Sequence, residues 1–248
     1  MALTRGNARR HSLHIARGAA PFILLQRTQL QSKQLRRALA RVRLQYVPVG
    51  LYLEGWLRRR SIEEAYVREI ESDFREIKAY LPQNVASIMD VGCGIAALDA
   101  LLFQYYGRQV RIIHLVDRNQ ISKKIYFGFQ HHAAFYNSLE RAKKTLTANG
   151  VPEGRIRTIE APADGRLRGI APLDLVISIL SWGFHFPIST YLSSVCDRLA
   201  PAGRLIVDVR RDTDGFDSLA ARFVNLSVIS ETHKAHRVCA QTLREPRE

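Results

Sequence analysis

The chain has 248 residues, of which 46% are hydrophobic and 24% charged, so it can fill one globular domain and is neither disordered nor collagen-like. It has no apolar run near the roughly 20 residues that cross a bilayer, and its three widely spaced cysteines exclude a disulfide framework, so a cytoplasmic location is expected. The net charge of +14 is high, but most of it lies near the N-terminus.

The first 53 residues form a basic extension with ten Arg and Lys residues and no acid, whereas residues 54–248 hold 27 basic and 23 acidic residues. We place the domain boundary at the first acid, Glu54, so that residues 1–53 precede a body of residues 54–248. Leucines between Leu24 and Leu44 have partial helical spacing, so the extension is expected to be partly helical. Four interpretations stay open: a surface-seeking helix, a nucleic-acid arm, a transit peptide or a plain extension.

A helix is predicted from Ser61 to Leu81, because Ile62, Tyr66 and Ile70 begin an apolar stripe at helical spacing. Ser61 is the expected N-cap, with Glu64 completing a capping box.

Beyond this helix, strands and helices alternate. This alternation predicts a parallel sheet with helices on both faces, because parallel strands need long crossover connections. The last two strands are separated by a short turn, which predicts an antiparallel pair at the sheet edge. The expected strands are 87–91, 111–116, 156–160, 173–180, 204–209, 225–230 and 235–242, and the expected helices are 96–105, 135–149, 189–199 and 216–223.

The segment that begins at Asp90 is the strongest local signal. Gly92 and Gly94 follow the first strand, where a missing Cβ allows close approach to the backbone and the next helix offers free N–H groups. Asp90 ends an apolar strand, a costly position for a carboxylate unless it meets a ligand or donors. Asp117 ends the second strand, where a carboxylate can accept both hydroxyls of a ribose.

Together these residues resemble the cofactor half of class I S-adenosylmethionine-dependent methyltransferases, over about residues 61–242. The resemblance implies a Rossmann-like, doubly wound, mostly parallel seven-stranded sheet with a C-terminal antiparallel hairpin, and S-adenosylmethionine as cofactor. Ala96 replaces the third glycine of the family's loop. A nicotinamide dehydrogenase is the rival, since Gly92, Gly94 and Ala97 also have its glycine-loop spacing. The residues implied to bind the cofactor are Asp90 at the amino group, Gly92 and Gly94 at the methionine part, Asp117 at the ribose, Arg118 at the adenine, and Cys93, Leu180 and Ser181.

The segment after the fourth strand is the expected place of the chemistry. His185 is the candidate general base, with a structural role as the alternative, and Trp182 and Phe184 either wall the substrate pocket or belong to the core. The long segment 118–134 contains Tyr126 and Phe129, which either cover the substrate or belong to a surface loop. No metal site is expected, because the adjacent pair at 131 and 132, both histidines, points apart and lacks a third ligand nearby.

The resulting hypothesis is methyl transfer to a small-molecule acceptor, with oxygen methylation of a metabolite or glycan-like compound expected. One alternative is an RNA or protein methyltransferase that docks through the basic extension. A second alternative is a non-catalytic scaffold that binds the cofactor. Because no motif residue lies before Gly50, removal of residues 1–50 is expected to leave cofactor binding intact.

Overall fold

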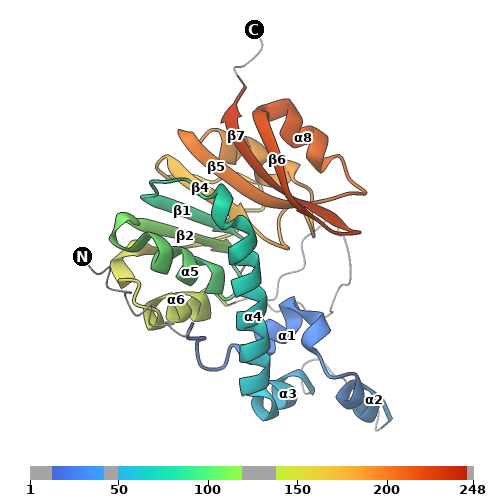
Figure 1. The fold of residues 1–248 in the computed structure, drawn as a ribbon. Coiled ribbons are helices and arrows are strands. Elements are labelled where there is room, and N and C mark those ends of the chain that lie inside the picture. The colour runs from blue at the N-terminus through green and yellow to red at the C-terminus, as the bar shows by residue number, and fades with distance from the viewer. Residues whose placement is uncertain (1–12, 42–49, 119–137, 245–248) are drawn as a thin grey trace, which may run out of the picture.

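The computed structural model describes residues 13–41, 50–118 and 138–244. Its strands are β1 (Ser87–Val91), β2 (Ile112–Asp117), β3 (Ile156–Glu160), β4 (Leu173–Ser178), β5 (Leu199–Arg210), β6 (Phe223–Glu231) and β7 (Ala235–Leu243). They form one seven-stranded sheet in the order β3-β2-β1-β4-β5-β7-β6 (Figure 1). Strands β1 to β5 pair in parallel, and β7 runs antiparallel to both β5 and β6. The predicted mostly parallel sheet and closing hairpin are therefore confirmed.

Helices cover both faces of this sheet. On one face α4 (Arg59–Ile77), α5 (Ala97–Tyr106) and α6 (Leu139–Ala148) share a hydrophobic cluster with Ile88 of β1 and Ile113 of β2. On the other face α7 (Ser189–Cys196) and α8 (Gly215–Arg222) pack with Met89 and Val91. Because side chains alternate along a strand, Asp90 shares the face of Ile88 and lies under α5. Within the described ranges, no helix has both the length and the apolarity needed to span a bilayer.

Helix α4 begins at Arg59, so the predicted N-cap at Ser61 is wrong. The reason is the short helix α3 (Leu51–Leu57), which leads directly into α4. The Arg58 N–H donates to the Glu54 carbonyl at 2.9 Å, and the Ile62 N–H donates to the Arg58 carbonyl at 3.0 Å. With the backbone donors satisfied across the junction, a serine cap has no orphan N–H to serve.

The N-terminal extension contributes to the core. Helix α1 (Ala20–Gln26) is buried from Ala20 to Leu25 and belongs to the same hydrophobic cluster as α4 and α5. A second helix, α2 (Lys33–Arg41), follows it and carries the exposed basic side chains. The boundary at Glu54 stays a prediction. The packing of α1 argues against the expectation that residues 1–50 can be removed without effect, because their removal would uncover apolar surface on α4.

Substituting Ile23 tests this packing. Ile23 of α1 is fully buried, and we expect Ile23→Ala to lower the free energy of unfolding by about 2 to 5 kcal/mol because it leaves a cavity. Arg37→Ala, on the exposed part of α2, is the control and should change stability by less than about 0.5 kcal/mol. Urea unfolding measures both, and equal small effects would show that α1 is not part of the cooperative core.

Candidate active site

The loop after β1 has the backbone geometry that its glycines predict. Gly92 and Gly94 have φ of +83° and +54°, and the following Ala96 has φ of +57° at the N-terminus of α5. A Cβ on Gly92 would overlap the Ser181 side chain, and one on Gly94 would lie 2.7 Å from Gln26 Oε1. The glycines thus admit two protein side chains against the loop, one of them from α1.

Asp117 holds this loop from the neighbouring strand. It is buried at the end of β2, and its Oδ2 accepts the Gly94 N–H at 3.0 Å while its Oδ1 accepts the Arg118 N–H at 2.7 Å. A carboxylate oxygen can accept more than one hydrogen bond. The sequence prediction that Asp90, Gly94 and Asp117 lie at one sheet edge agrees with this geometry, while their cofactor roles stay predictions.

A second buried acid, which the sequence reasoning missed, accompanies Asp90. Asp99 lies in the first turn of α5 and is fully buried, and Asp90 is 5% exposed. Burial, followed by the nearby charge of Asp99, raises the pKa of Asp90 well above its usual range. Burial also raises the pKa of Asp99 to about 7. The signal was present in the sequence, because Asp99 is an acid within the otherwise apolar stretch 95–103.

The loop after β4 is fixed to the sheet on two sides. The Ser178 hydroxyl donates to the Val91 carbonyl at 2.7 Å, and the Trp182 N–H donates to the Ser178 hydroxyl at 2.9 Å. Leu180 has φ of +53°, a conformation that a leucine rarely adopts, and its N–H donates to Asp208 Oδ2 at 3.0 Å. Asp208 of β5 therefore helps to hold the strained turn beside Gly92.

Asp208 in turn belongs to a buried ion network. Arg237 of β7 donates from Nε to Asp208 Oδ1 at 2.8 Å and from Nη2 to Oδ2 at 3.0 Å. It also donates to Asp73 Oδ1 at 2.9 Å and Glu76 Oε2 at 3.1 Å, both on α4. Asp73 contacts Arg27 at 3.4 Å, just after α1. The network therefore joins the C-terminal hairpin, α4, the extension and the loop after β4.

The predicted residues after β4 divide into core and partly exposed positions. Trp182 is fully buried, and its indole N–H donates to the Ile188 carbonyl at 2.7 Å, which favours the core role over the pocket wall. Phe184 and His185 are half-buried, with ring centroids 4.9 Å apart. The His185 N–H donates to the Ser181 carbonyl at 2.7 Å. The catalytic role of His185 stays a prediction.

The remaining predicted residues lie either outside the described part of the chain or in the glycine loop. Tyr126, Phe129 and the histidines at 131 and 132 lie outside the described residues. Cys93 is buried in the loop, and burial raises the pKa of its thiol. In the part of the chain that the structure describes, no group of three or more His, Cys, Asp or Glu side chains is arranged to hold a metal ion.

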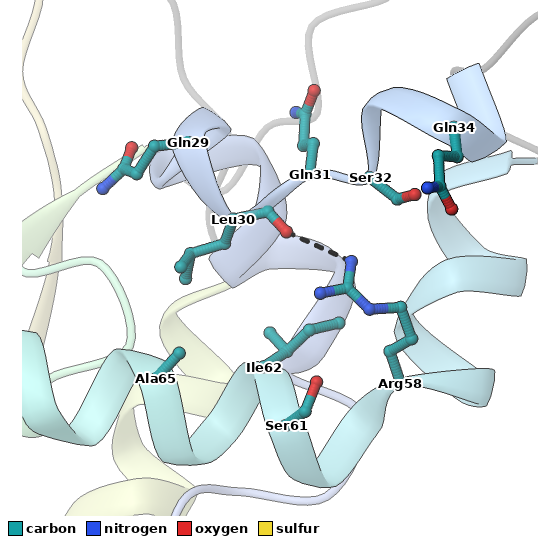
Figure 2. Close-up of a pocket in the computed structure, with 9 residues that line it drawn as sticks. All are labelled: Gln29, Leu30, Gln31, Ser32, Gln34, Arg58, Ser61, Ile62 and Ala65. Carbon is teal, nitrogen blue, oxygen red and sulfur yellow. Dashed lines mark hydrogen bonds between the residues drawn. The ribbon is translucent and has the colours of Figure 1, made fainter. Parts of the chain in front are cut away.

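A cavity of about 480 Å³ lies elsewhere, between the start of α4 and the segment that follows α1 (Figure 2). Arg58 reaches across it to the Leu30 carbonyl at 3.3 Å. The residues that line it are Gln29, Leu30, Gln31, Ser32, Gln34, Arg58, Ser61, Ile62 and Ala65. None of them is a predicted site residue, so we place the candidate site at the carboxyl edge of the sheet.

Comparisons with known proteins match the chain through its fold. No family model matches it, and no curated protein matches it by sequence. Among solved structures, precorrin 8W decarboxylase of Methanobacterium thermoautotrophicum is 16% identical and covers 71% of this chain and 90% of its own, with a TM-score of 0.47. Precorrin-6y C5,15-methyltransferase of Geobacter metallireducens is 15% identical and covers 70% of this chain and 87% of its own, with a TM-score of 0.48. TrmN of Thermus thermophilus is 13% identical and covers 69% of this chain and 48% of its own, with a TM-score of 0.44.

The strand order 3-2-1-4-5-7-6, with β7 alone antiparallel to its neighbours, decides the fold. It is a Rossmann-like α/β fold with a closing antiparallel hairpin. The fold does not by itself give a reaction, so the function of this chain has to be argued from its site.

Breaking the ion network should destabilise the protein strongly. Arg237→Met leaves the buried Asp208 without its counter-ion, and we expect a loss of about 3 to 5 kcal/mol in the free energy of unfolding. Arg211→Met removes the exposed ion pair with Glu231 and should cost less than about 1 kcal/mol. Denaturant unfolding measures the free energy of unfolding of both variants. Similar losses in the two would show that burial of the ion pair does not determine its contribution to stability.

Proposed function

We propose that the protein transfers a methyl group from S-adenosylmethionine to an oxygen of a small-molecule acceptor, a metabolite or glycan-like compound. The observation that carries the proposal is the cluster of Asp90, Gly94 and Asp117 at the carboxyl ends of β1 and β2, next to the point between β1 and β4. The strand order reverses at this point, and open α/β sheets bind their ligands there.

The residues present fit this cofactor. The loop at Gly92 and Gly94 already takes the left-handed backbone that close approach requires, and the Asp117 carboxylate at the end of β2 is a group that can accept hydrogen bonds from ribose hydroxyls. Asp90 provides a carboxylate for the ammonium group, and Arg118 follows Asp117 toward the adenine. Cys93, Leu180 and Ser181 complete the set that we assign to cofactor binding, Ser181 because it lies against Gly92.

Once bound, the cofactor supplies a methyl group activated by a sulfonium. The protein's part is then to align the acceptor and to remove the proton of its hydroxyl. We assign proton removal to His185, which is half-buried in the turn next to Ser181, and a wall of the acceptor site to Phe184. The Arg210 guanidinium lies 5.7 Å from the Phe184 ring centroid and helps to orient it.

Calorimetric titration tests the cofactor. We expect S-adenosylmethionine and its demethylated product, S-adenosylhomocysteine, to bind with micromolar affinity and NAD not to bind, because the loop and both acids fit the former. NAD binding alone would replace the methyltransferase proposal with the dehydrogenase. Cofactor binding without methylation of any acceptor in a broad screen would favour the non-catalytic scaffold.

Asp117→Ala should weaken binding of S-adenosylhomocysteine by roughly 10- to 100-fold, because a charge-assisted pair of hydrogen bonds is worth about 1.5 to 3 kcal/mol. Asp164→Ala, which removes an exposed acid paired with Arg168, is the matched control and should bind like the wild type. If Asp117→Ala lowered the melting temperature sharply while its folded fraction bound normally, Asp117 would have a structural role through Gly94 instead.

A second candidate function, methylation of RNA or protein, is favoured by one observation. Helix α2 carries exposed Lys33, Arg36, Arg37 and Arg41 and no acidic residue. A basic helix of this kind suits a polyanionic partner. The salt dependence of acceptor binding separates the candidates, because several phosphate contacts make affinity fall steeply with salt and a neutral small molecule does not.

A further inference from the structure

Asp99 has no place in the function proposed above, although it is the most buried acid near the candidate cofactor loop. Its side chain is fully buried, and among the described residues neither of its carboxylate oxygens has a hydrogen-bond donor. A buried polar group without a partner costs free energy, and an unpaired buried charge costs much more. The cost is avoided if Asp99 shares a proton with a neighbouring acid.

That neighbour is Asp90. It is buried on the face of β1 that α5 covers, and it lies close enough to Asp99 for each carboxyl group to affect the pKa of the other. Two carboxylates cannot bond to each other, because both only accept, but a carboxylic acid and a carboxylate can. Two close carboxyl groups therefore titrate as a unit that retains one proton.

Within the described ranges, the neighbouring groups that affect the pair do not supply a positive charge that would neutralise it. Asp117 of β2 adds negative charge, and Cys93 in the loop and Tyr66 on α4 both have raised pKa values and stay neutral near pH 7. The charge of Arg27, just after α1, lowers the pKa of Tyr66, while that of Asp73 raises it. Arg27 forms an ion pair with Asp73, so its charge is already compensated.

We propose that Asp99 is a positioning residue for the cofactor: it accepts the proton that Asp90 must give up when Asp90 binds the cofactor's ammonium group. The inference rests on the proposed function. In the free protein one proton is shared by the two carboxyl groups. On binding, the ammonium group stabilises the Asp90 carboxylate, and the proton moves to Asp99, which then donates a hydrogen bond to Asp90. No proton is lost near neutral pH, whereas at lower pH, where both groups are protonated, binding releases one.

The pH dependence of binding tests this step, with S-adenosylhomocysteine as the probe. For the wild type we expect the Kd to rise at least about tenfold between pH 8 and pH 5.5, because each pH unit below the titration of the pair costs up to tenfold in affinity. Asp99→Asn keeps the size and the donor but removes the second acid. Its Kd should rise less between pH 8 and pH 5.5 than that of the wild type, because the charge of Asp99 is removed while burial still raises the pKa of Asp90.

Calorimetry in buffers of different ionisation enthalpy should show proton release approaching one at pH 5.5 for the wild type and a smaller release for Asp99→Asn. Asp164→Asn, an exposed position, is the control and should keep the wild-type profile. An unchanged pH profile in Asp99→Asn would overturn the proposal and leave the proposed function standing. Failure of the wild type to bind at any pH would instead overturn the proposed function.

A measurement without cofactor tests the pair alone. Because the folded-state pKa of Asp99 is raised, its proton contributes stability at acid pH that is lost as pH rises from about 4 to about 7. Asp99→Asn cannot lose this contribution, so its melting temperature should rise relative to the wild type over that interval. A constant difference would show that Asp99 does not hold a shared proton.

Discussion

The contact on which the arrangement of this protein most depends is the buried pair of Arg237 and Asp208. Burying these two charges has a desolvation cost, which further hydrogen bonds help to offset. Arg237 also donates to Asp73 and Glu76, and Asp208 accepts the Leu180 N–H. The pair thus connects the last strand of the chain to α4 and to the turn beside Gly92. This chain of contacts is a physical route by which a change at the C-terminal hairpin would reach the candidate active site.

The same network explains why the N-terminal extension is part of the folded body. Arg27 contacts Asp73 just after α1, and Gln26 lies against Gly94. Composition pointed the other way, because ten basic residues without an acid look separate from a nearly balanced body. The charge of Arg27 is compensated by an acid 46 residues away in sequence, and no count of charges within a segment can detect such a partner.

Local patterns were sufficient for the sheet and the motif. Strand β3 has the predicted bounds, and Asp90 and Asp117 lie at the ends of neighbouring parallel strands, as predicted. Both features could be predicted because apolar runs and glycine turns are short-range signals. The N-cap at Ser61 was wrong because continuity with α3 satisfied the donors that a cap would serve. Asp208 was missed for a different reason: its partner Arg237 pairs with it across two antiparallel strands, and that register exists only in the folded sheet.

The sign of the charge at the sheet edge bears on the choice of cofactor. The charges of Asp99 and Asp117 raise the pKa of Asp90, and the charges of all three acids raise the pKa of Cys93. This acidic cluster is buried in an otherwise basic protein. A dinucleotide would bring its negatively charged pyrophosphate to the glycine loop, where buried carboxylates repel it. A ligand with a sulfonium and an ammonium group has the opposite effect, because it compensates acids that are costly to keep ionised. The cost of keeping these acids ionised and a preference for a cationic ligand would therefore have the same physical origin.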